Sequence, residues 1–243
     1  MTSILTNLAN DTIDLWFIDP ATLPPSQVND LTALLSEEEF AKLKHYRHQA
    51  TRHTALLTRA ISRLVLSHYT QTPAVSLTFT KQPNGKPELA NNPHNIRFNL
   101  SHNDQLIVLA VCVNDEIGCD IESPNRKVNI PAITRRFFAP QEQQLLSQLP
   151  EQLQQQQFFE IWTLKEAFVK ATGLGIALGL DRFYFQTLPF IKVLFNAPSP
   201  LPQQAWQFYQ TPLKQQLLAI CRASEQKQSV HIYDARTLLE NTV

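Results

Sequence analysis

The sequence is poor in glycine and cysteine, and it has no long hydrophobic run. Only five of its 243 residues are glycine and three are cysteine. No stretch of about 18 apolar residues occurs, which argues against a transmembrane helix, and the N-terminus lacks the charged-then-apolar layout of a secretory signal. We therefore expect a cytoplasmic protein with no membrane association. The cysteines, without metal-ligand or disulfide spacing, are expected to be reduced core residues: Cys112, Cys119 and Cys221.

Acidic residues are absent from one long stretch of the chain, although the formal net charge is zero. No aspartate or glutamate lies between Phe40 and Pro87. Such a block suits an anionic ligand or an acidic partner protein, and a solvated helix face is the alternative. The zero net charge and the lack of a stacking-aromatic motif argue against nucleic-acid binding. The positive charges of the stretch come from Lys42, Lys44, Arg47, Arg52, Arg59, Arg63, Lys81 and Lys86.

The order of strand and helix patterns predicts an α+β protein. Residues 12–19 read as a strand, and the capping-box pattern at Ser36 opens a long helix that is expected to reach about Tyr69. Apolar residues form one stripe of this helix, and basic residues occupy much of the remaining surface. The first half is completed by strands expected at 75–79, 96–102, 106–113 and 117–122.

The second half repeats this order of strand, long helix and antiparallel strands. A fold of two similar subdomains follows, each a long helix packed on a small antiparallel sheet and related by a pseudo-two-fold axis. We expect an N-terminal subdomain at 1–114, a C-terminal one at 115–243, an active site at their interface and a monomeric protein. Helices are predicted at 131–138, 140–147 and 150–173, and strands at 182–186, 191–195, 205–209, 216–222 and 230–234, before a short helical tail.

The predicted helix 150–173 combines, from Phe159 onward, a core stripe with reactive side chains. Its apolar residues recur near every third or fourth position, and Lys165, Glu166 and Lys170 lie beside them. The helix is expected to end at Gly173, a residue free to adopt positive φ. The alternative is an ordinary amphipathic helix in which Glu166 and Lys170 form a surface pair. The glutamine run from Gln154 to Gln157 is interpreted as solvated surface.

A pair of acids on the preceding strand indicates a cation site. Asp120 and Glu122 fall on one face, about 6.5 Å apart along the strand, while Ile121 faces the opposite way. Like carboxylates side by side repel unless a cation lies between them, and hard oxygen ligands suit Mg²⁺. Glu166 would supply a third carboxylate. An exposed strand face is the alternative.

Three further residues suit phosphate contacts. His102 stands where a strand gives way to a turn, beside Ser101, and its ring N–H can bind a phosphate or be satisfied locally. Lys86 follows Gly85 in a turn, and it is either a plain surface lysine or a point charge for a phosphate.

Taken together, these motifs resemble the motif set of a known enzyme family. Asn-Gly-Lys86-Pro87, Phe-Asn-Leu-Ser101-His102, Ile-Gly-Cys-Asp120-Ile-Glu122 and Trp162-Thr-Leu-Lys165-Glu166-Ala-Phe-Val-Lys170-Ala-Thr-Gly occur in this order. The set is similar to that of 4′-phosphopantetheinyl transferases of the long, pseudodimeric type represented by the surfactin-synthetase-activating enzyme. The resemblance covers about residues 36–186, whereas the chain after 186 carries no recognised motif.

The resemblance implies an enzyme that moves 4′-phosphopantetheine from coenzyme A to a serine of an acyl, peptidyl or polyketide carrier protein, releasing adenosine 3′,5′-bisphosphate. Asp120, Glu122 and Glu166 match its Mg²⁺ ligands, and Glu166 also matches its proposed general base. Lys170 matches the residue that stabilises or protonates the leaving bisphosphate. His102 and Lys86, with the adjacent Ser101 and Pro87, match the phosphate-contact motifs.

The resemblance to the family's motifs is weaker in the basic helix that contains Arg47 and Arg52, and at Lys165. The resemblance implies basic residues that hold the 3′-phosphate; we assign Arg47 and Arg52, with His48 or His53 as substitutes. Lys165 matches a cofactor-binding motif position or supports the site. A paralogue that binds coenzyme A or a carrier protein without catalysis is the alternative function, although no carboxylate or lysine of the set is missing.

Overall fold

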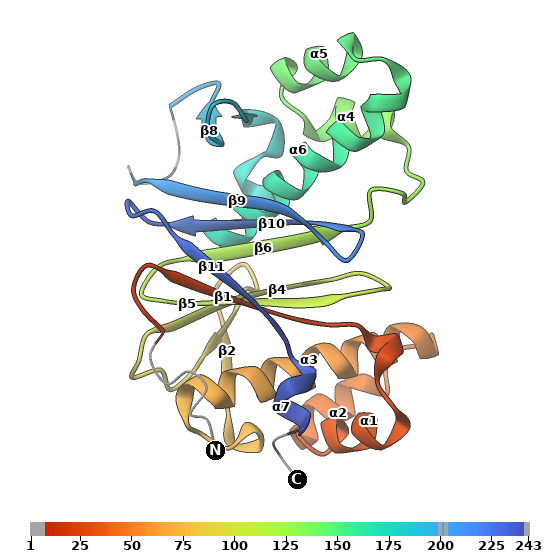
Figure 1. The fold of residues 1–243 in the computed structure, drawn as a ribbon, viewed down its shortest axis with the longest axis vertical. Coiled ribbons are helices and arrows are strands. Elements are labelled where there is room, and N and C mark those ends of the chain that lie inside the picture. Colours follow the sequence, from red (N-terminus) through yellow and green to blue (C-terminus); the bar gives the residue numbers. More distant parts are fainter. Residues whose placement is uncertain (1–7, 199–200, 202–203, 241–243) are drawn as a thin grey trace. The chain divides into compact units, whose positions relative to one another are not determined.

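The computed structural model describes residues 8–198, 201 and 204–240, so the N-terminal segment considered above for a secretory signal lies outside the described part. The protein is α+β, as predicted, and its chain divides into two compact units. Unit 1 holds residues 1–81, 87–114 and 229–243, and unit 2 holds residues 82–86 and 115–228. None of the described helices is long and apolar enough to cross a membrane. Figure 1 shows the elements of both units.

Unit 1 is built on a four-stranded sheet in the order β11-β1-β5-β4. Its strands are β1 (Thr12–Ile18), β4 (Ile96–His102), β5 (Ile107–Val113) and β11 (Ser229–Asp234). Strand β5 is buried throughout, because it lies inside the sheet and carries an unbroken apolar run. The pairs β1–β5 and β4–β5 are antiparallel as expected, but β1 and β11 run parallel, so this sheet is mixed.

The single long helix expected from Ser36 to Tyr69 is wrong, because the structure breaks it in two. The capping box opens α2 (Glu37–Leu43), a turn follows, and α3 (Gln49–Thr70) begins after it. The sequence explains the break, since the apolar stripe lapses between Tyr46 and Leu56 and nothing there ties a continuing helix to the core. An unexpected helix, α1 (Pro25–Thr32), begins at a proline, which suits the first helical turn.

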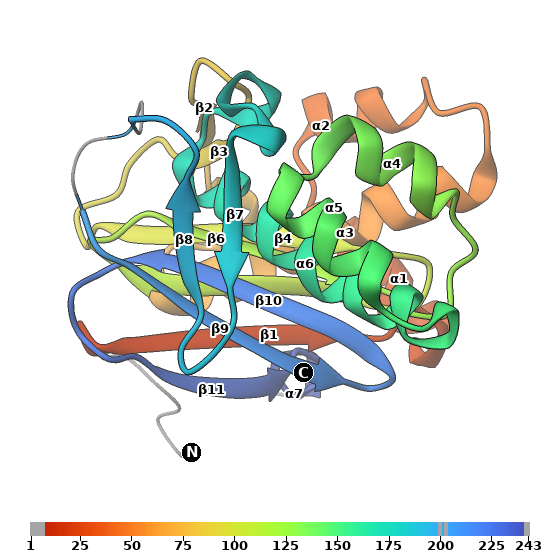
Figure 2. The same ribbon diagram turned by 90° about the horizontal axis from the view of Figure 1, so that it is seen from above.

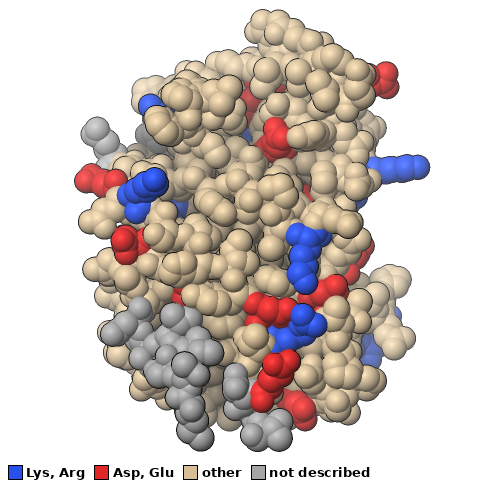
Figure 3. Space-filling view, in the orientation of Figure 1, with Lys and Arg blue, Asp and Glu red and all other residues tan. Residues whose placement is uncertain are grey.

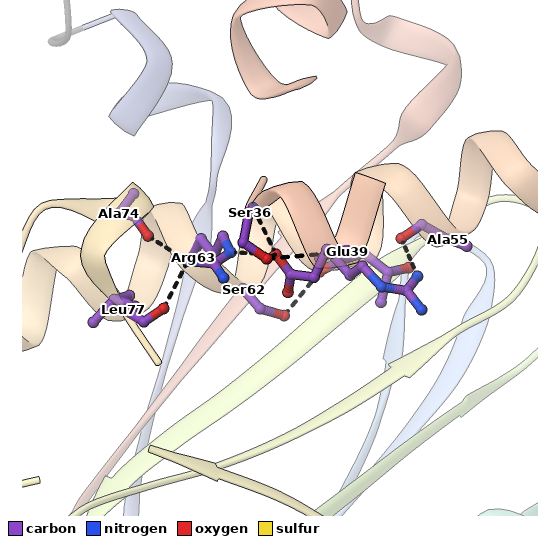
Figure 4. Close-up of polar contacts among 9 residues, drawn as sticks. Ser36, Glu39, Ala55, Ser62, Arg63, Ala74 and Leu77 are labelled. Atoms are coloured by element: carbon purple, nitrogen blue, oxygen red, sulfur yellow. Dashed lines mark hydrogen bonds and ion pairs between the residues drawn. The ribbon is translucent and has the colours of Figure 1, made fainter. Parts of the chain in front are cut away.

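The basic side of α3 is less exposed than predicted. Arg63 is only 3% exposed, and its guanidinium lies inside unit 1. It donates to the Glu39 carboxylate at 2.7 Å and to the carbonyl oxygens of Ala74 and Leu77 at 2.7 and 2.9 Å (Figure 4). Arg63 therefore ties α2 and a short 3₁₀ segment to α3, and it does not contribute to a ligand-binding face.

The segment after α3 also differs from its prediction. Instead of a strand at 75–79, a 3₁₀ turn occupies Ala74–Ser76, and a short hairpin pairs β2 (Phe79–Lys81) with β3 (Pro87–Leu89). The tip of this hairpin, residues 82–86, is assigned to unit 2.

Unit 2 contains a three-stranded antiparallel sheet, β6-β10-β9, covered on one face by the helix α6 (Figure 1). Helices α4 and α5 pack on α6 (Figure 2), and a separate hairpin joins β7 and β8. The helix α6 ends at Gly173 in the left-handed conformation, as predicted. The bounds are β6 (Ile117–Glu122), α4 (Ile130–Phe137), α5 (Pro140–Gln148), α6 (Glu151–Thr172), β7 (Phe183–Gln186), β8 (Lys192–Phe195), β9 (Trp206–Leu213) and β10 (Gln216–Ala223).

Helix α6 lies directly against β6 because Gly118 has no side chain. A Cβ at this position would overlap the carbonyl oxygen of Ala167 and the amide nitrogen of Ala171. Since side chains alternate along a strand, Asp120 and Glu122 project on the same side as Gly118, toward α6. A glycine on β6 thus brings the acids of the strand close to the side chains of the helix.

The other side of α6 is fixed by a buried ion pair. Lys165 is fully buried, not beside the core as expected, and its ammonium group lies 2.7 Å from the Glu142 carboxylate. It also donates to the carbonyl oxygens of Leu180 and Phe183, each at 2.7 Å. Glu142 in turn accepts from the backbone N–H groups of Ala139 and Phe185. All three ammonium donors are satisfied, which is the condition for a buried charge to be tolerated.

The units differ from the expected division 1–114 and 115–243 in two segments. Residues 229–243 belong to unit 1, because β11 pairs with β1, and α7 (Arg236–Glu240) follows it there. The hairpin tip 82–86 belongs to unit 2, because Lys86 bonds to Glu116 in that unit. The three cysteines are buried free thiols, as expected.

Replacing Arg63 by alanine should lower the free energy of unfolding by about 3 kcal/mol or more, because the Glu39 carboxylate and two carbonyl oxygens lose a buried donor. Urea unfolding followed by circular dichroism measures this cost. Arg59→Ala is the matched control, since Arg59 lies on the same helix and, among the described residues, donates to the carbonyl oxygen of Ala55 one turn earlier. Its expected cost is within about 0.5 kcal/mol of zero. Equal effects of the two substitutions would refute the structural role of Arg63.

Candidate functional site

Three carboxylates and an ammonium group gather where β6 faces α6. Asp120 and Glu122 alternate with Ile121, which is 1% exposed and points into the core, as the strand pattern predicts. Glu166 and Lys170 lie one turn apart on α6. The four side chains all belong to unit 2, so their arrangement is set within one compact body.

Lys170 is held by β6. Its Nζ donates to Asp120 Oδ1 at 2.7 Å and to the carbonyl oxygen of Cys119 at 3.1 Å. Burial alone would lower the pKa of Lys170, but the negative charges of Asp120 and Glu166 outweigh burial and raise the pKa. The ammonium group therefore stays protonated throughout the physiological range, as a cation fixed beside the carboxylates.

The two glutamates of the cluster resist ionisation. Burial is the largest cause of the raised pKa of Glu166, and the nearby charges of Asp120 and Glu122 raise it further, against the opposing effect of Lys170. The pKa of Glu122 is raised by burial and then by the charge of Asp120. Asp120, Glu122 and Glu166, when ionised, therefore place three negative charges in one region that holds too little positive charge to balance them.

Two residues at Glu122 were not anticipated from the sequence. Arg126 Nη2 lies 3.0 Å from both carboxylate oxygens of Glu122, and Trp162 Nε1 donates to Oε1 at 3.3 Å. Trp162 is the first residue of the helix motif named above, and its indole N–H gives this aromatic residue a polar contact that the motif does not predict. Arg126 lies in a loop after β6, where no periodic pattern could show that its side chain turns back.

The donor set fits a divalent cation, although no site is preassembled in the described part of the chain. No group of three or more His, Cys, Asp or Glu side chains there is arranged to hold one metal ion. Asp120 instead binds Lys170, and Glu122 binds Arg126. However, the acids supply only hard oxygen donors, and the ionised forms that repel one another are the forms that Mg²⁺ binds. Asp120, Glu122 and Glu166 are the residues that could hold it.

The two lysines predicted at cofactor-binding positions, Lys86 and Lys165, make structural contacts in unit 2. Lys86 Nζ lies 2.6 Å from Glu116 Oε2 and 3.2 Å from the carbonyl oxygen of Ala171, so it satisfies a carbonyl at the C-terminal end of α6. Lys165 lies in the interior and its three donors are taken, which favours the supporting role over direct ligand contact. Pro87, the neighbour of Lys86, begins β3 in unit 1.

The remaining candidates lie in unit 1. Arg47 is exposed in the turn between α2 and α3, and Arg52 and His53 line a surface cavity of about 550 Å³ on α3. Ser101 is buried while His102 is exposed, so the two neighbours face opposite sides of β4. On the face drawn in Figure 3, charged side chains are sparse and both signs occur, in agreement with a charged content of 17%.

Two family models match the sequence, and both describe the same enzyme family. Residues 24–114 match "4'-phosphopantetheinyl transferase, N-terminal", and residues 116–221 match "4'-phosphopantetheinyl transferase superfamily". The holo-[acyl-carrier-protein] synthase of Thermotoga maritima has a similar solved structure, with a TM-score of 0.37, 14% identity, and coverage of 46% of this chain and 66% of that chain.

Curated relatives are considerably closer in sequence. The 4′-phosphopantetheinyl transferase HetI of Nostoc is 37% identical over 172 residues, which are 70% of this chain and 72% of HetI. The 4′-phosphopantetheinyl transferase Sfp of Bacillus subtilis is 30% identical over 151 residues, 62% of this chain and 66% of Sfp. On this identity and coverage, the chain belongs to the 4′-phosphopantetheinyl transferase superfamily.

Proposed function

We propose that the protein transfers 4′-phosphopantetheine from coenzyme A to a serine hydroxyl of an acyl, peptidyl or polyketide carrier protein, releasing adenosine 3′,5′-bisphosphate. The observation that carries the proposal is the cluster of Asp120, Glu122, Glu166 and Lys170 in unit 2 of a member of this family. It combines an acceptor for the serine proton with a fixed cation for the charge that develops on the leaving phosphate.

Glu166 is the proposed base. Its carboxylate is partly buried among other acids, and its raised pKa makes it a stronger proton acceptor than an ordinary glutamate once ionised. Lys170, whose pKa is also raised, carries a proton and a positive charge to the same place. It is proposed to stabilise or protonate the leaving bisphosphate.

Asp120, Glu122 and Glu166 are proposed to hold Mg²⁺ when coenzyme A binds. A bound Mg²⁺ would neutralise pyrophosphate charge and orient the group to be transferred. For this, Asp120 and Glu122 would exchange part of their present contacts with Lys170 and Arg126 for the ion. The raised pKa values of Glu122 and Glu166 beside Asp120 support this assignment, since a divalent cation would relieve the repulsion between these acids.

Phosphate contacts by Arg47, Arg52, Lys86, Ser101 and His102 remain predictions. The surface cavity beside Arg52 and His53 supports an anion contact by α3, whereas Lys86 already donates to Glu116 and to the carbonyl oxygen of Ala171. A cytoplasmic location, a monomeric state and the absence of nucleic-acid or membrane partners are part of the same proposal. The alternative is a paralogue that binds coenzyme A or a carrier protein without catalysis. The sequence favours the enzyme, because all the matched acids and lysines are present.

Asp120→Asn should abolish transfer and weaken Mg²⁺ binding, because one of three carboxylates loses its charge. Mass spectrometry of an apo carrier protein incubated with coenzyme A and Mg²⁺ measures transfer, and calorimetry with Mn²⁺ measures metal binding. Glu225→Gln, which removes an exposed carboxylate elsewhere in unit 2, is the control and should leave both unchanged. Wild-type transfer by the Asp120→Asn protein would show that this cluster is not the active site.

Lys170→Met should lower kcat by about 10²- to 10⁴-fold while the KM for coenzyme A changes little, because the lysine acts on the leaving group during transfer. Lys170→Arg keeps the positive charge and should recover part of the rate. Steady-state kinetics with a carrier protein separates the two constants. A rise in KM with unchanged kcat would assign Lys170 to ground-state binding instead.

A further inference from the structure

The chain passes between the two units at four peptide bonds, which follow residues 81, 86, 114 and 228. The last two passages are called the junctions below. The first junction joins Asn114 to Asp115, and the second joins Gln228 to Ser229. The long segment of unit 2 therefore begins at one junction and ends at the other. The proposed chemistry uses none of these four residues, so it does not explain their contacts.

One buried arginine of unit 2 binds both junctions. Arg222, on β10, is 1% exposed, and a guanidinium group at such a place needs bonded partners. Its Nε and Nη2 lie 3.0 and 2.9 Å from Asp115 Oδ2, and its Nη1 donates to Gln228 Oε1. Asp115 and Gln228 lie far apart in the sequence. A single side chain thus holds together the two ends of the long segment of unit 2.

The unit 1 side of each junction is bonded as well. The backbone N–H of Asn114 donates to the carbonyl oxygen of Asn95 at 2.9 Å, and its side-chain amide donates to Asn10 Oδ1 at 3.0 Å. The backbone N–H of Ser229 donates to the carbonyl oxygen of Asp11 at 2.9 Å. A hinge needs a few residues that can change φ and ψ, and no residue separates the bonded ends of either junction.

The tip of the β2–β3 hairpin is fixed at the same end of unit 2. Its last residue, Lys86, lies 2.6 Å from Glu116, which directly follows Asp115 in the chain. The carbonyl oxygen of Glu116 accepts from the backbone N–H of Ala223, the neighbour of Arg222. Lys86 and Arg222 therefore hold two consecutive acids, and three of the four passages are bonded within this small part of unit 2.

We propose that Arg222 is a positioning residue of the transferase, because it fixes both junctions to unit 2 and so limits movement between the units. Its effect on the reaction rests on the proposed function. The proposed phosphate contacts of Arg52 and His102 belong to unit 1, whereas the carboxylate cluster belongs to unit 2. A coenzyme A molecule that uses both groups depends on the junctions. Metal binding by the cluster depends on unit 2 alone.

Hydrogen–deuterium exchange followed by mass spectrometry measures how firmly the junctions are held. Arg222→Met removes every donor of the guanidinium, so exchange should rise by about tenfold or more in the peptides that contain Asn114 and Ser229. Lys227→Met, which replaces an exposed cation beside the second junction, is the matched control and should leave exchange unchanged. Two milder variants test the same bonds singly. Asp115→Ala should raise exchange at the first junction, and Gln228→Ala should raise it at the second.

Kinetics and metal binding separate positioning from a general loss of structure. Arg222→Met should raise the KM for coenzyme A by about fivefold or more, with a smaller change in kcat. Mn²⁺ binding, measured by calorimetry, should stay unchanged, because the carboxylate cluster lies within unit 2. Arg222→Lys keeps the positive charge and should recover part of the KM.

Unchanged exchange at both junctions in folded Arg222→Met protein overturns the proposal. If that variant does not fold, unchanged exchange in both Asp115→Ala and Gln228→Ala overturns it instead. Raised exchange with an unchanged KM refutes the positioning role, and an equal loss of Mn²⁺ binding would make Arg222 a general support of unit 2. If wild-type protein binds coenzyme A but modifies no carrier protein, the proposed function fails, and the exchange experiment still tests the junctions.

Discussion

The close contact between Gly118 and α6 is the constraint on which the candidate site depends. Any side chain at this position would overlap the backbone of the helix, so α6 could not approach β6 as it does. With the helix in place, Lys170 reaches both Asp120 and the backbone of β6. Without it, the acids of the strand would face solvent, and neither the burial that raises the pKa of Glu122 nor the bond from Lys170 to Asp120 would arise.

Unit 2 contains two different arrangements of buried charged side chains. Lys165 has every donor satisfied by Glu142 and two carbonyl oxygens, so it fixes α6 without offering anything to a ligand. Glu122 and Glu166 have raised pKa values, first because they are partly buried and then because of the charges of neighbouring carboxylates. The fully bonded Lys165 is typical of a structural role, and the acid cluster near Lys170 is typical of a functional site. A cluster whose charges are already balanced gains little from binding a cation.

Much of this site could be predicted from local sequence patterns. Period two places Asp120 and Glu122 on one face, and helical periodicity places Glu166 and Lys170 together, so both predictions needed only short-range geometry. The predictions that failed involved environments set by distant residues. The long helix breaks where its apolar stripe lapses, and the strand expected at 75–79 gives way to a turn bound by Arg63. The burial of Arg63 depends on its ion pair with Glu39, which lies 24 positions earlier in the chain. The periodicity of a helix gives no indication of such a distant partner.

The glutamine run shows why a groove is harder to predict than a cluster. In unit 2, the N-terminal half of α6, the loop after β6 and the β9–β10 hairpin line a groove of about 680 Å³. On α6 alone, Gln155 and Gln156 look like ordinary surface residues, since an amide side chain gives no indication of what lies opposite. Their surroundings come from a loop 31 residues before Gln155 and from a hairpin that contacts Glu160 from 50 residues later in the chain. Because Pro124 leads directly from the strand that carries Glu122, the same chain path that positions the acid also forms the wall of the groove. One wall of the groove and the acid Glu122 therefore lie on one continuous segment of β6 and its loop, so a shift of that segment should move both together.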